Sequence, residues 1–126
     1  MARILIVDDD DGVRRVLRKM FEGAGHEVSE AESGDAALAT LDGPTPPDAV
    51  VSDVLMPGLS GIAFYHKLAE QAPHLRRRVV FLTGANHDPD VHRPIEQLGV
   101  PMLGKLDDLQ LVVDAIRIAL LRRTTR

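Results

Sequence analysis

The sequence predicts a single α/β domain in which five strands of a parallel sheet alternate with five helices. Three observations predict this class. The chain has 126 residues, which is enough for one domain with a substantial core and too few for two. Apolar runs alternate with segments of helical spacing, and no internal repeat or low-complexity stretch interrupts them. Several of these runs are continuous, as parallel strands covered on both faces require.

The strands are predicted from the apolar runs. Residues 4–7, 49–51 and 79–82 are continuous and rich in β-branched side chains, so we expect them at the centre of the sheet. Residues 26–31 alternate more, and residues 101–103 are short and begin with proline, so both fit the sheet edges. Right-handed crossovers place helices on both faces, which gives a three-layer sandwich.

The first helix is predicted from its caps and its apolar spacing. Asp10 or Asp11 can serve as the N-cap, and Gly23 or Gly25 closes the helix. The residues that recur at helical spacing, and that we expect to face inward, are Val13, Val16, Leu17, Met20 and Phe21.

The second and third helices are bounded by capping and breaking residues. Ser33 can cap the second, which ends before the proline-rich residues 43–47. The third runs from about Gly61 to Pro73. The apolar residues they carry are Ala37, Leu38, Leu41, Ile62, Tyr65 and Leu68.

The fourth and fifth helices differ in regularity. Asp88 caps the fourth and Pro89 takes its first position, but Pro94 removes a hydrogen bond at a cost of roughly 3 kcal/mol, so we expect a short, kinked or mobile helix. The fifth is expected to start at Asp107 or Asp108, with an apolar surface wider than the sheet needs. The inward residues are predicted to be Val91, Ile95, Leu98, Leu109, Val112, Val113, Ile116 and Leu120, with Leu111, Ala115 and Ile118 beside the last stripe.

Composition excludes several classes of function. The chain has no cysteine, which excludes a disulfide framework, thiol catalysis and thiolate zinc sites. The net charge of −4 gives no footprint for direct nucleic-acid binding, apart from a basic run at residues 122–126 that we interpret as a tail or linker stub. The short apolar N-terminal run ends in acid, so neither a signal peptide nor a membrane span is expected, and we expect a cytoplasmic protein.

Polar residues follow four of the predicted strands. Asp8 and Asp9 follow the first strand, Asp53 the third, Thr83 the fourth and Lys105 the fifth. Ligands of open parallel sheets bind beyond the carboxyl ends of the strands, where the strand order reverses. Neighbouring strands lie about 4.8 Å apart, so these groups can share one pocket.

This set of groups suits phosphoryl transfer assisted by a metal ion. Crowded carboxylates repel one another unless a divalent cation neutralises them, and Mg²⁺ prefers carboxylate oxygens. We therefore predict Asp8, Asp9 and Asp53 as Mg²⁺ ligands and Asp53 as the nucleophile that accepts a phosphoryl group. Lys105 would pair with Asp53 and then with a phosphoryl oxygen, and Thr83 would donate its hydroxyl to another oxygen.

Four segments together resemble the response regulator receiver domain of two-component signalling: ILIVDD at residues 4–9, DVLMPGLSG at 53–61, FLTG at 81–84 and GK at 104–105. The resemblance covers essentially the whole chain, with residues 1–121 as the domain. It implies the flavodoxin-like fold of strand order 2-1-3-4-5. It also implies a phosphohistidine donor on a histidine kinase or phosphotransfer protein, and the backbone carbonyl of Leu55 as a further metal ligand.

Simpler interpretations apply to single residues. Asp10 and Asp11 are better explained as helix caps than as metal ligands. Thr83 alone could be an ordinary strand residue and Lys105 a solvated loop lysine, so their functional role depends on the nearby carboxylates. The five histidines share no metal-binding spacing and are expected at the surface.

The sequence departs from the receiver pattern in three places. Leu106 follows Lys105 where receivers usually have a proline in a cis bond, so the loop is expected to be trans and differently placed. Met102 stands where an aromatic residue is common, which predicts a different relay. Leu55 and Ala85 are apolar at positions that influence water attack, so we expect slow loss of the phosphoryl group.

The leading hypothesis is therefore a switch rather than an enzyme, with phosphorylation of Asp53 altering a partner-binding surface on the fourth helix, fifth strand and fifth helix. The apolar flank of the last helix, with Val91 and Ile95, would bind a partner, and a second copy of the chain is one candidate. Two alternatives stay open. One is a degenerate receiver that acts only as a docking module. The other is an Asp-nucleophile phosphatase, which would need a carboxylate at the position of Leu55.

Overall fold

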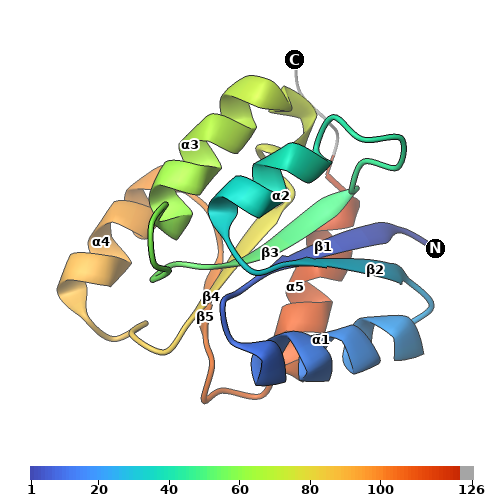
Figure 1. Ribbon diagram of the computed structural model, residues 1–126. Coiled ribbons are helices and arrows are strands. Elements are labelled where there is room, and N and C mark those ends of the chain that lie inside the picture. The colour runs from blue at the N-terminus through green and yellow to red at the C-terminus, as the bar shows by residue number, and fades with distance from the viewer. Residues whose placement is uncertain (123–126) are drawn as a thin grey trace.

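The predicted strands form one parallel five-stranded sheet in the order β2-β1-β3-β4-β5, as Figure 1 shows, so the predicted fold class is confirmed. The structure is a computed structural model and describes residues 1–122. The predicted tail at 122–126 therefore lies, except for Arg122, outside the described residues. The strands are β1 (Arg3–Val7), β2 (Glu27–Ala31), β3 (Ala49–Asp53), β4 (Val79–Thr83) and β5 (Met102–Gly104).

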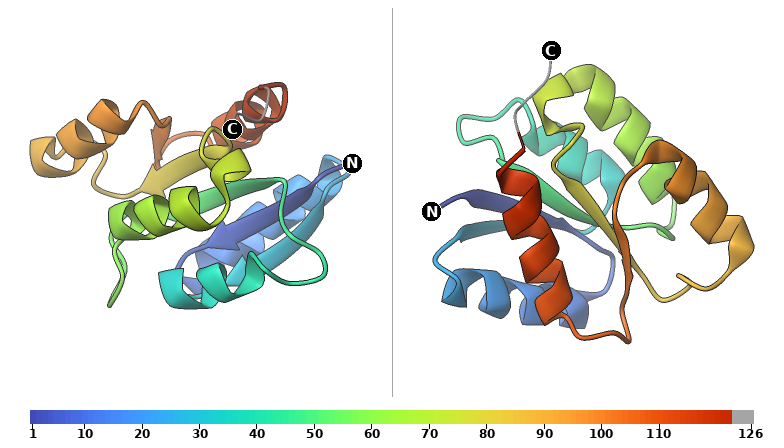
Figure 2. Two further views of the ribbon diagram at one scale, coloured as in Figure 1. Left: turned by 90° about the horizontal axis from the view of Figure 1, so that it is seen from above. Right: turned by 180° about the vertical axis from the view of Figure 1, so that it is seen from behind.

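Helices cover both faces of the sheet, which gives the three layers. Figures 1 and 2 show helices packed against both faces of the sheet. The helices are α1 (Asp11–Gly23), α2 (Gly34–Thr40), α3 (Gly61–Gln71), α4 (Pro89–Leu98) and α5 (Gln110–Leu120), with a short 3-10 helix η1 (Pro73–Leu75) after α3. None of the helices in the described part of the chain has the length and apolar content needed to cross a bilayer.

The core consists of two apolar clusters, one on each side of the sheet. The side chains of β1, β3 and β4 alternate between the two clusters. Helices α2, α3 and α4 pack on one cluster, and α1 and α5 pack on the other. Strands β3 and β4 are buried at every residue, as their continuous apolar sequence predicts for central strands, whereas β2 is largely exposed at its edge.

The predicted caps of α1, α2 and α4 are confirmed in their local geometry. The side chains of Asp10, Ser33 and Asp88 accept backbone N–H bonds at the starts of α1, α2 and α4. Helix α4 is short, at ten residues, and continues through Pro94. It ends at Gly99 in a left-handed conformation.

The start of α5 differs from the prediction. The helix begins at Gln110 and not at Asp107 or Asp108, and its N-cap residue Leu109 makes no side-chain capping bond. The carboxylate of Asp107 accepts a bond from the Gly104 backbone N–H, which lies before it in the chain. Asp108 accepts from the Gln110 backbone N–H in a tight turn.

The structure tests the predicted positions of three apolar residues, and one of them differs. Val16 on α1 is 46% exposed, because Leu17 and Phe21 are the residues that face the sheet. Val91 and Ile95 are buried against the α3 side of the core, so the prediction that they face inward is confirmed. The further prediction that they contribute to a partner-binding surface is wrong for the same reason.

Candidate functional site

The predicted site residues converge at the carboxyl edge of the sheet. Asp8 directly follows β1, and Asp53 and Thr83 are the last residues of β3 and β4. The strand register aligns Asp53 with Leu82 and Thr83 with Gly104, so Lys105 directly follows the residue beside Thr83. Adjacent strands of one parallel sheet therefore bring these groups together from positions far apart in the sequence.

The acidic side chains form a compact cluster of oxygen atoms. One carboxylate oxygen from each of Asp8, Asp9 and Asp53 lies within 4.8 Å of the others. Asp8 and Asp53 are 2% and 4% exposed, whereas Asp9 is open to solvent. Two carboxylates of the cluster, Asp8 and Asp53, are thus buried, and solvent reaches the cluster at Asp9.

Lys105 bridges the two buried carboxylates. Its Nζ lies 3.0 Å from Asp8 Oδ2 and 3.1 Å from Asp53 Oδ2. No cis peptide bond occurs within residues 1–122, so the bond to Leu106 is trans, as predicted. The loop nevertheless brings the ammonium group to the two carboxylates, while the Leu106 side chain is 97% exposed.

Burial and charge perturb the two partners of this bridge. Burial raises the pKa of Asp53, the neighbouring Asp8 carboxylate raises it further, and Lys105 only partly offsets these effects. Burial lowers the pKa of Lys105, but its bonds to Asp8 and Asp53 outweigh that effect and the pKa is raised. The ammonium group of Lys105 is therefore charged at neutral pH. The raised pKa of Asp53 means that burial and the Asp8 carboxylate together disfavour its charged form more than Lys105 favours it.

Backbone groups fix the orientation of the two buried carboxylates. Asp53 Oδ1 accepts a 2.8 Å bond from the Val54 N–H, and Asp8 Oδ1 accepts a 2.9 Å bond from the Asp10 N–H.

Gly61, the first residue of α3, donates its N–H to the Val54 carbonyl at 2.8 Å. A Cβ atom at Gly61 would meet the Asp53 carbonyl oxygen and lie 2.7 Å from the Val54 Cα, so only glycine permits this approach.

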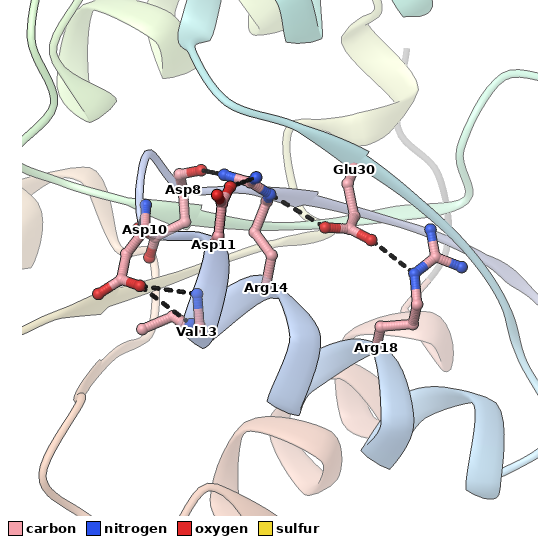
Figure 3. Close-up of polar contacts among 8 residues, drawn as sticks. Asp8, Asp10, Asp11, Val13, Arg14, Arg18 and Glu30 are labelled. Carbon is pink, nitrogen blue, oxygen red and sulfur yellow. Dashed lines mark hydrogen bonds and ion pairs between the residues drawn. The ribbon is translucent and has the colours of Figure 1, made fainter.

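Arg14 supports the acidic loop and was missed by the sequence analysis. Its guanidinium donates to the Asp8 carbonyl at 2.6 Å and to Glu30 at 2.9 Å, and it pairs with Asp11 (Figure 3). Glu30 in turn accepts a 2.5 Å bond from Arg18. The bonds from Arg18 and Arg14 lower the pKa of Glu30 despite its partial burial. The spacing of Asp11, Arg14 and Arg18 along one face of α1 is visible in the sequence and indicates ion pairs on that face. Their link to Glu30 on β2 depends on how α1 packs beside that strand.

The remaining predicted residues are not part of the acidic cluster. Thr83 is fully buried, and its Oγ1 accepts a 3.2 Å bond from the Ala85 N–H. Asp10 caps α1 and Asp11 pairs with Arg14, so the capping interpretation fits Asp10. The Leu55 side chain is 57% exposed, and the role of its carbonyl stays a prediction. Four of the five histidines are exposed, and His26 is half-buried, where it accepts a bond from the Ala2 N–H.

The cluster fits a hard divalent cation. Asp8, Asp9 and Asp53 carry three carboxylates and Lys105 one ammonium group, which leaves two negative charges uncompensated within the cluster. Oxygen ligands on one accessible and two buried carboxylates are the donors that Mg²⁺ takes alongside water. Nitrogen or sulfur ligands that would favour zinc are not part of this donor set.

Comparisons with known proteins agree with this arrangement. The family model of the response regulator receiver domain matches residues 4–117. The chain is 33% identical over 106 residues to the response regulator receiver protein CpdR of Brucella abortus, covering 80% of this chain and 86% of that protein. It is 38% identical over 90 residues to protein PilH of Pseudomonas aeruginosa, covering 71% and 74%. A response regulator receiver domain protein from Clostridium thermocellum has a TM-score of 0.82 at 28% identity, covering 95% and 94%.

Proposed function

This chain belongs to the response regulator receiver domain family of two-component signalling, and on that premise we propose that Asp53 accepts a phosphoryl group from a phosphohistidine. The observation that carries the proposal is the bridge from Lys105 to Asp53 and Asp8 beside the exposed carboxylate of Asp9. A buried carboxylate, an ammonium group and two further acids are the groups that an acyl-phosphate switch needs.

The transfer exchanges one bond for another. The bond between the phosphorus and the imidazole nitrogen breaks, a bond from phosphorus to a carboxylate oxygen of Asp53 forms, and the imidazole leaves and takes up a proton from solvent. Asp8, Asp9, Asp53 and the Leu55 carbonyl would hold Mg²⁺, which would neutralise charge on the phosphoryl oxygens. Lys105 exchanges its bond to Asp53 for one to a phosphoryl oxygen, since its long stem already reaches the pocket.

Thr83 links this chemistry to the rest of the domain. Its oxygen now accepts from Ala85, and its hydroxyl hydrogen is available to a phosphoryl oxygen. A shift of Thr83 toward the phosphoryl group would alter the segment between β4 and α4, because Ala85 belongs to that segment. The affected surface is formed by α4, β5 and α5.

The output surface is apolar on α5. Leu111 and Ile118 are 46% and 55% exposed on this helix, more than core packing requires. This surface would bind the output partner, and a second copy of the chain is one candidate, with a sensor kinase or phosphotransfer protein as the phosphoryl donor. The domain is thus a switch whose own turnover is slow, since neither Leu55 nor Ala85 offers a polar group to hold an attacking water.

Phosphodonor chemistry tests the proposal directly. The protein is incubated with Mg²⁺ and either acetyl phosphate or phosphoramidate, whose phosphorus–nitrogen bond resembles that of phosphohistidine. Intact mass spectrometry is expected to show one added phosphoryl group, which hydroxylamine removes, as an acyl phosphate requires. Asp53→Asn should abolish it, whereas Asp35→Asn, an exposed aspartate at the start of α2, should leave it unchanged.

Each other outcome has a definite meaning. Mg²⁺ binding without phosphorylation from either donor would contradict the proposal and favour the docking module. Phosphorylation that survives in Asp53→Asn would place the acceptor elsewhere. Phosphoryl loss that is as fast as its uptake would contradict the slow switch and favour the phosphatase alternative.

A further inference from the structure

Glu30 is an acidic residue of the edge strand β2 and is not part of the acidic cluster. Val28 packs on the apolar cluster of α1 and α5, whereas Ala31 belongs to the opposite cluster. Since side chains alternate along a strand, Glu30 faces α1. The strand register places it beside Ile6, two residues before Asp8. Its side chain is only 28% exposed, so its charge needs partners from the protein.

The carboxylate of Glu30 binds two guanidinium groups of α1, one with each oxygen. Oε1 accepts a 2.9 Å bond from Arg14 Nε, and Oε2 accepts a 2.5 Å bond from Arg18 Nε (Figure 3). The bond from Arg18, followed by that from Arg14, holds the pKa of Glu30 below its usual range, so the carboxylate is ionised at neutral pH. Charge-assisted bonds at both oxygens fix the orientation of this carboxylate.

Arg14 connects this fixed carboxylate to the acidic cluster. Its Nη1 donates to the Asp8 carbonyl at 2.6 Å. That carbonyl belongs to the peptide between Asp8 and Asp9, so the bond holds the peptide that joins two of the three acids in the cluster. The Asp8 N–H donates to the Ala31 carbonyl of β2 at 3.1 Å. Strand β2 therefore holds the backbone of Asp8 directly at its N–H and through Arg14 at its carbonyl.

The bond to Glu30 determines where the Arg14 guanidinium points. The guanidinium is a rigid plane, so a bond at Nε sets the direction of Nη1 as well. The other acidic partner of Arg14 is Asp11, whose side chain is 76% exposed. Water competes for an ion pair at that exposure, so Asp11 holds the arginine less firmly than Glu30 does. Without Glu30, the long arginine side chain would regain conformational freedom.

We propose that Glu30 is a positioning residue for Mg²⁺ binding and acts on the Asp8 carbonyl through the guanidinium group of Arg14. The inference rests on the proposed function, because it concerns the cation that the acidic cluster would hold. Mg²⁺ demands near-ideal octahedral geometry, so a small displacement of the peptide between Asp8 and Asp9 lowers its affinity. Glu30 thus affects the cation without contributing a ligand.

Titration of the ¹⁵N-labelled full chain with Mg²⁺, followed by the amide NMR signals of residues 8–12, measures this affinity. Glu30→Gln should weaken Mg²⁺ binding about fivefold. Glu27→Gln is the matched control, because it makes the same charge change on β2 and breaks an ion pair to Arg3 of 3.1 Å. It should leave the affinity unchanged. Urea denaturation in EDTA identifies the temperature range in which each variant is fully folded.

A double variant separates positioning through Arg14 from the charge of Glu30 acting through space. In an Arg14→Gln background, Glu30→Gln should cause no further loss of Mg²⁺ affinity, because the connection to Asp8 is already broken. A fivefold loss that persists in this background would overturn the proposal. The Arg14 Nε–H signal of the unmodified protein is a second measurement, and it should exchange slowly with water. Rapid exchange would also overturn the proposal.

The remaining outcomes distinguish this inference from the proposed function. Saturable Mg²⁺ binding that Glu30→Gln leaves unchanged, or that Glu27→Gln weakens equally, would overturn the inference alone. Mg²⁺ that does not bind to the unmodified protein would overturn both.

Discussion

The ammonium group of Lys105 lies 3.1 Å from the carboxylate of Asp53, although 52 residues separate the two in the chain. The same group lies 3.0 Å from Asp8, so one lysine compensates two buried acids. A metal ion bound by these acids would compete with Lys105 for their carboxylate groups. The bridge therefore makes stability, metal affinity and phosphorylation respond differently to one substitution.

Lys105→Gln should lower the free energy of unfolding in EDTA by about 2 kcal/mol, because it leaves two buried carboxylates without their counter-charge. Its Mg²⁺ affinity should rise several-fold, since no cation competes for the carboxylates, while phosphorylation by acetyl phosphate should slow. Urea denaturation, Mg²⁺ titration and intact mass measure the three effects. Lys19→Gln on the exposed face of α1 is the control, and a weaker Mg²⁺ affinity in Lys105→Gln would contradict the argument.

Asp53→Asn should stabilise the metal-free protein at neutral pH by about 1 kcal/mol, because it removes a buried charge that repels Asp8 while Lys105 keeps its bond to Asp8. The pKa of Asp53 is raised in the folded protein, so the folded state holds this proton more tightly than the unfolded chain. The contribution of Asp53 to stability therefore falls as pH rises from about 4 through its raised pKa.

The measurement is urea denaturation in EDTA at several pH values from about 4 to 7. The difference in unfolding free energy between Asp53→Asn and the unmodified protein should grow as pH rises. Asp35→Asn should show no such trend. A difference that shrinks with rising pH would mean that the Lys105 bond outweighs burial and repulsion.

Arg14→Gln should loosen the turn that carries Asp8 and Asp9. It removes the bond to the Asp8 carbonyl and the pair with Glu30, so we expect a loss of about 2 kcal/mol in unfolding free energy. Mg²⁺ affinity should also fall several-fold, measured by titration well below the unfolding temperature. Arg15→Gln, the next residue on α1, is the matched control, and unchanged Mg²⁺ affinity in folded Arg14→Gln would limit Arg14 to a structural role.

Gly61→Ala should destabilise the domain by about 2 kcal/mol, because the new Cβ would meet the Asp53 carbonyl and the Val54 backbone. The peptide that carries Asp53 must shift to relieve this contact, so the proposed phosphorylation should slow as well. Gly23→Ala at the end of α1 meets nothing within 4 Å and should be neutral or slightly stabilising. Thermal unfolding and intact mass after acetyl phosphate treatment test both variants, and equal stability of the two would refute the steric argument.

Local sequence determined the elements and their order. The continuous apolar runs of β1, β3 and β4 and the caps at Asp10, Ser33 and Asp88 act within a few residues, so they could be recognised from the chain alone. The resemblance to a known family added the strand order. Together they predicted that Asp8, Asp53, Thr83 and Lys105 follow strands at one edge of the sheet.

Only the tertiary structure decided how these groups and their neighbours pair. Lys105 reaches both acids despite its trans bond to Leu106. Arg14 donates to the carbonyl of Asp8 and to Glu30 on β2. The start of α5 at Gln110, after a loop in which Asp107 accepts a bond from the Gly104 N–H, was also not apparent from the sequence. Sequence periodicity reports which face of an element is apolar, but the partner of a charged side chain depends on which elements pack together and at what register, and that is set by the whole fold.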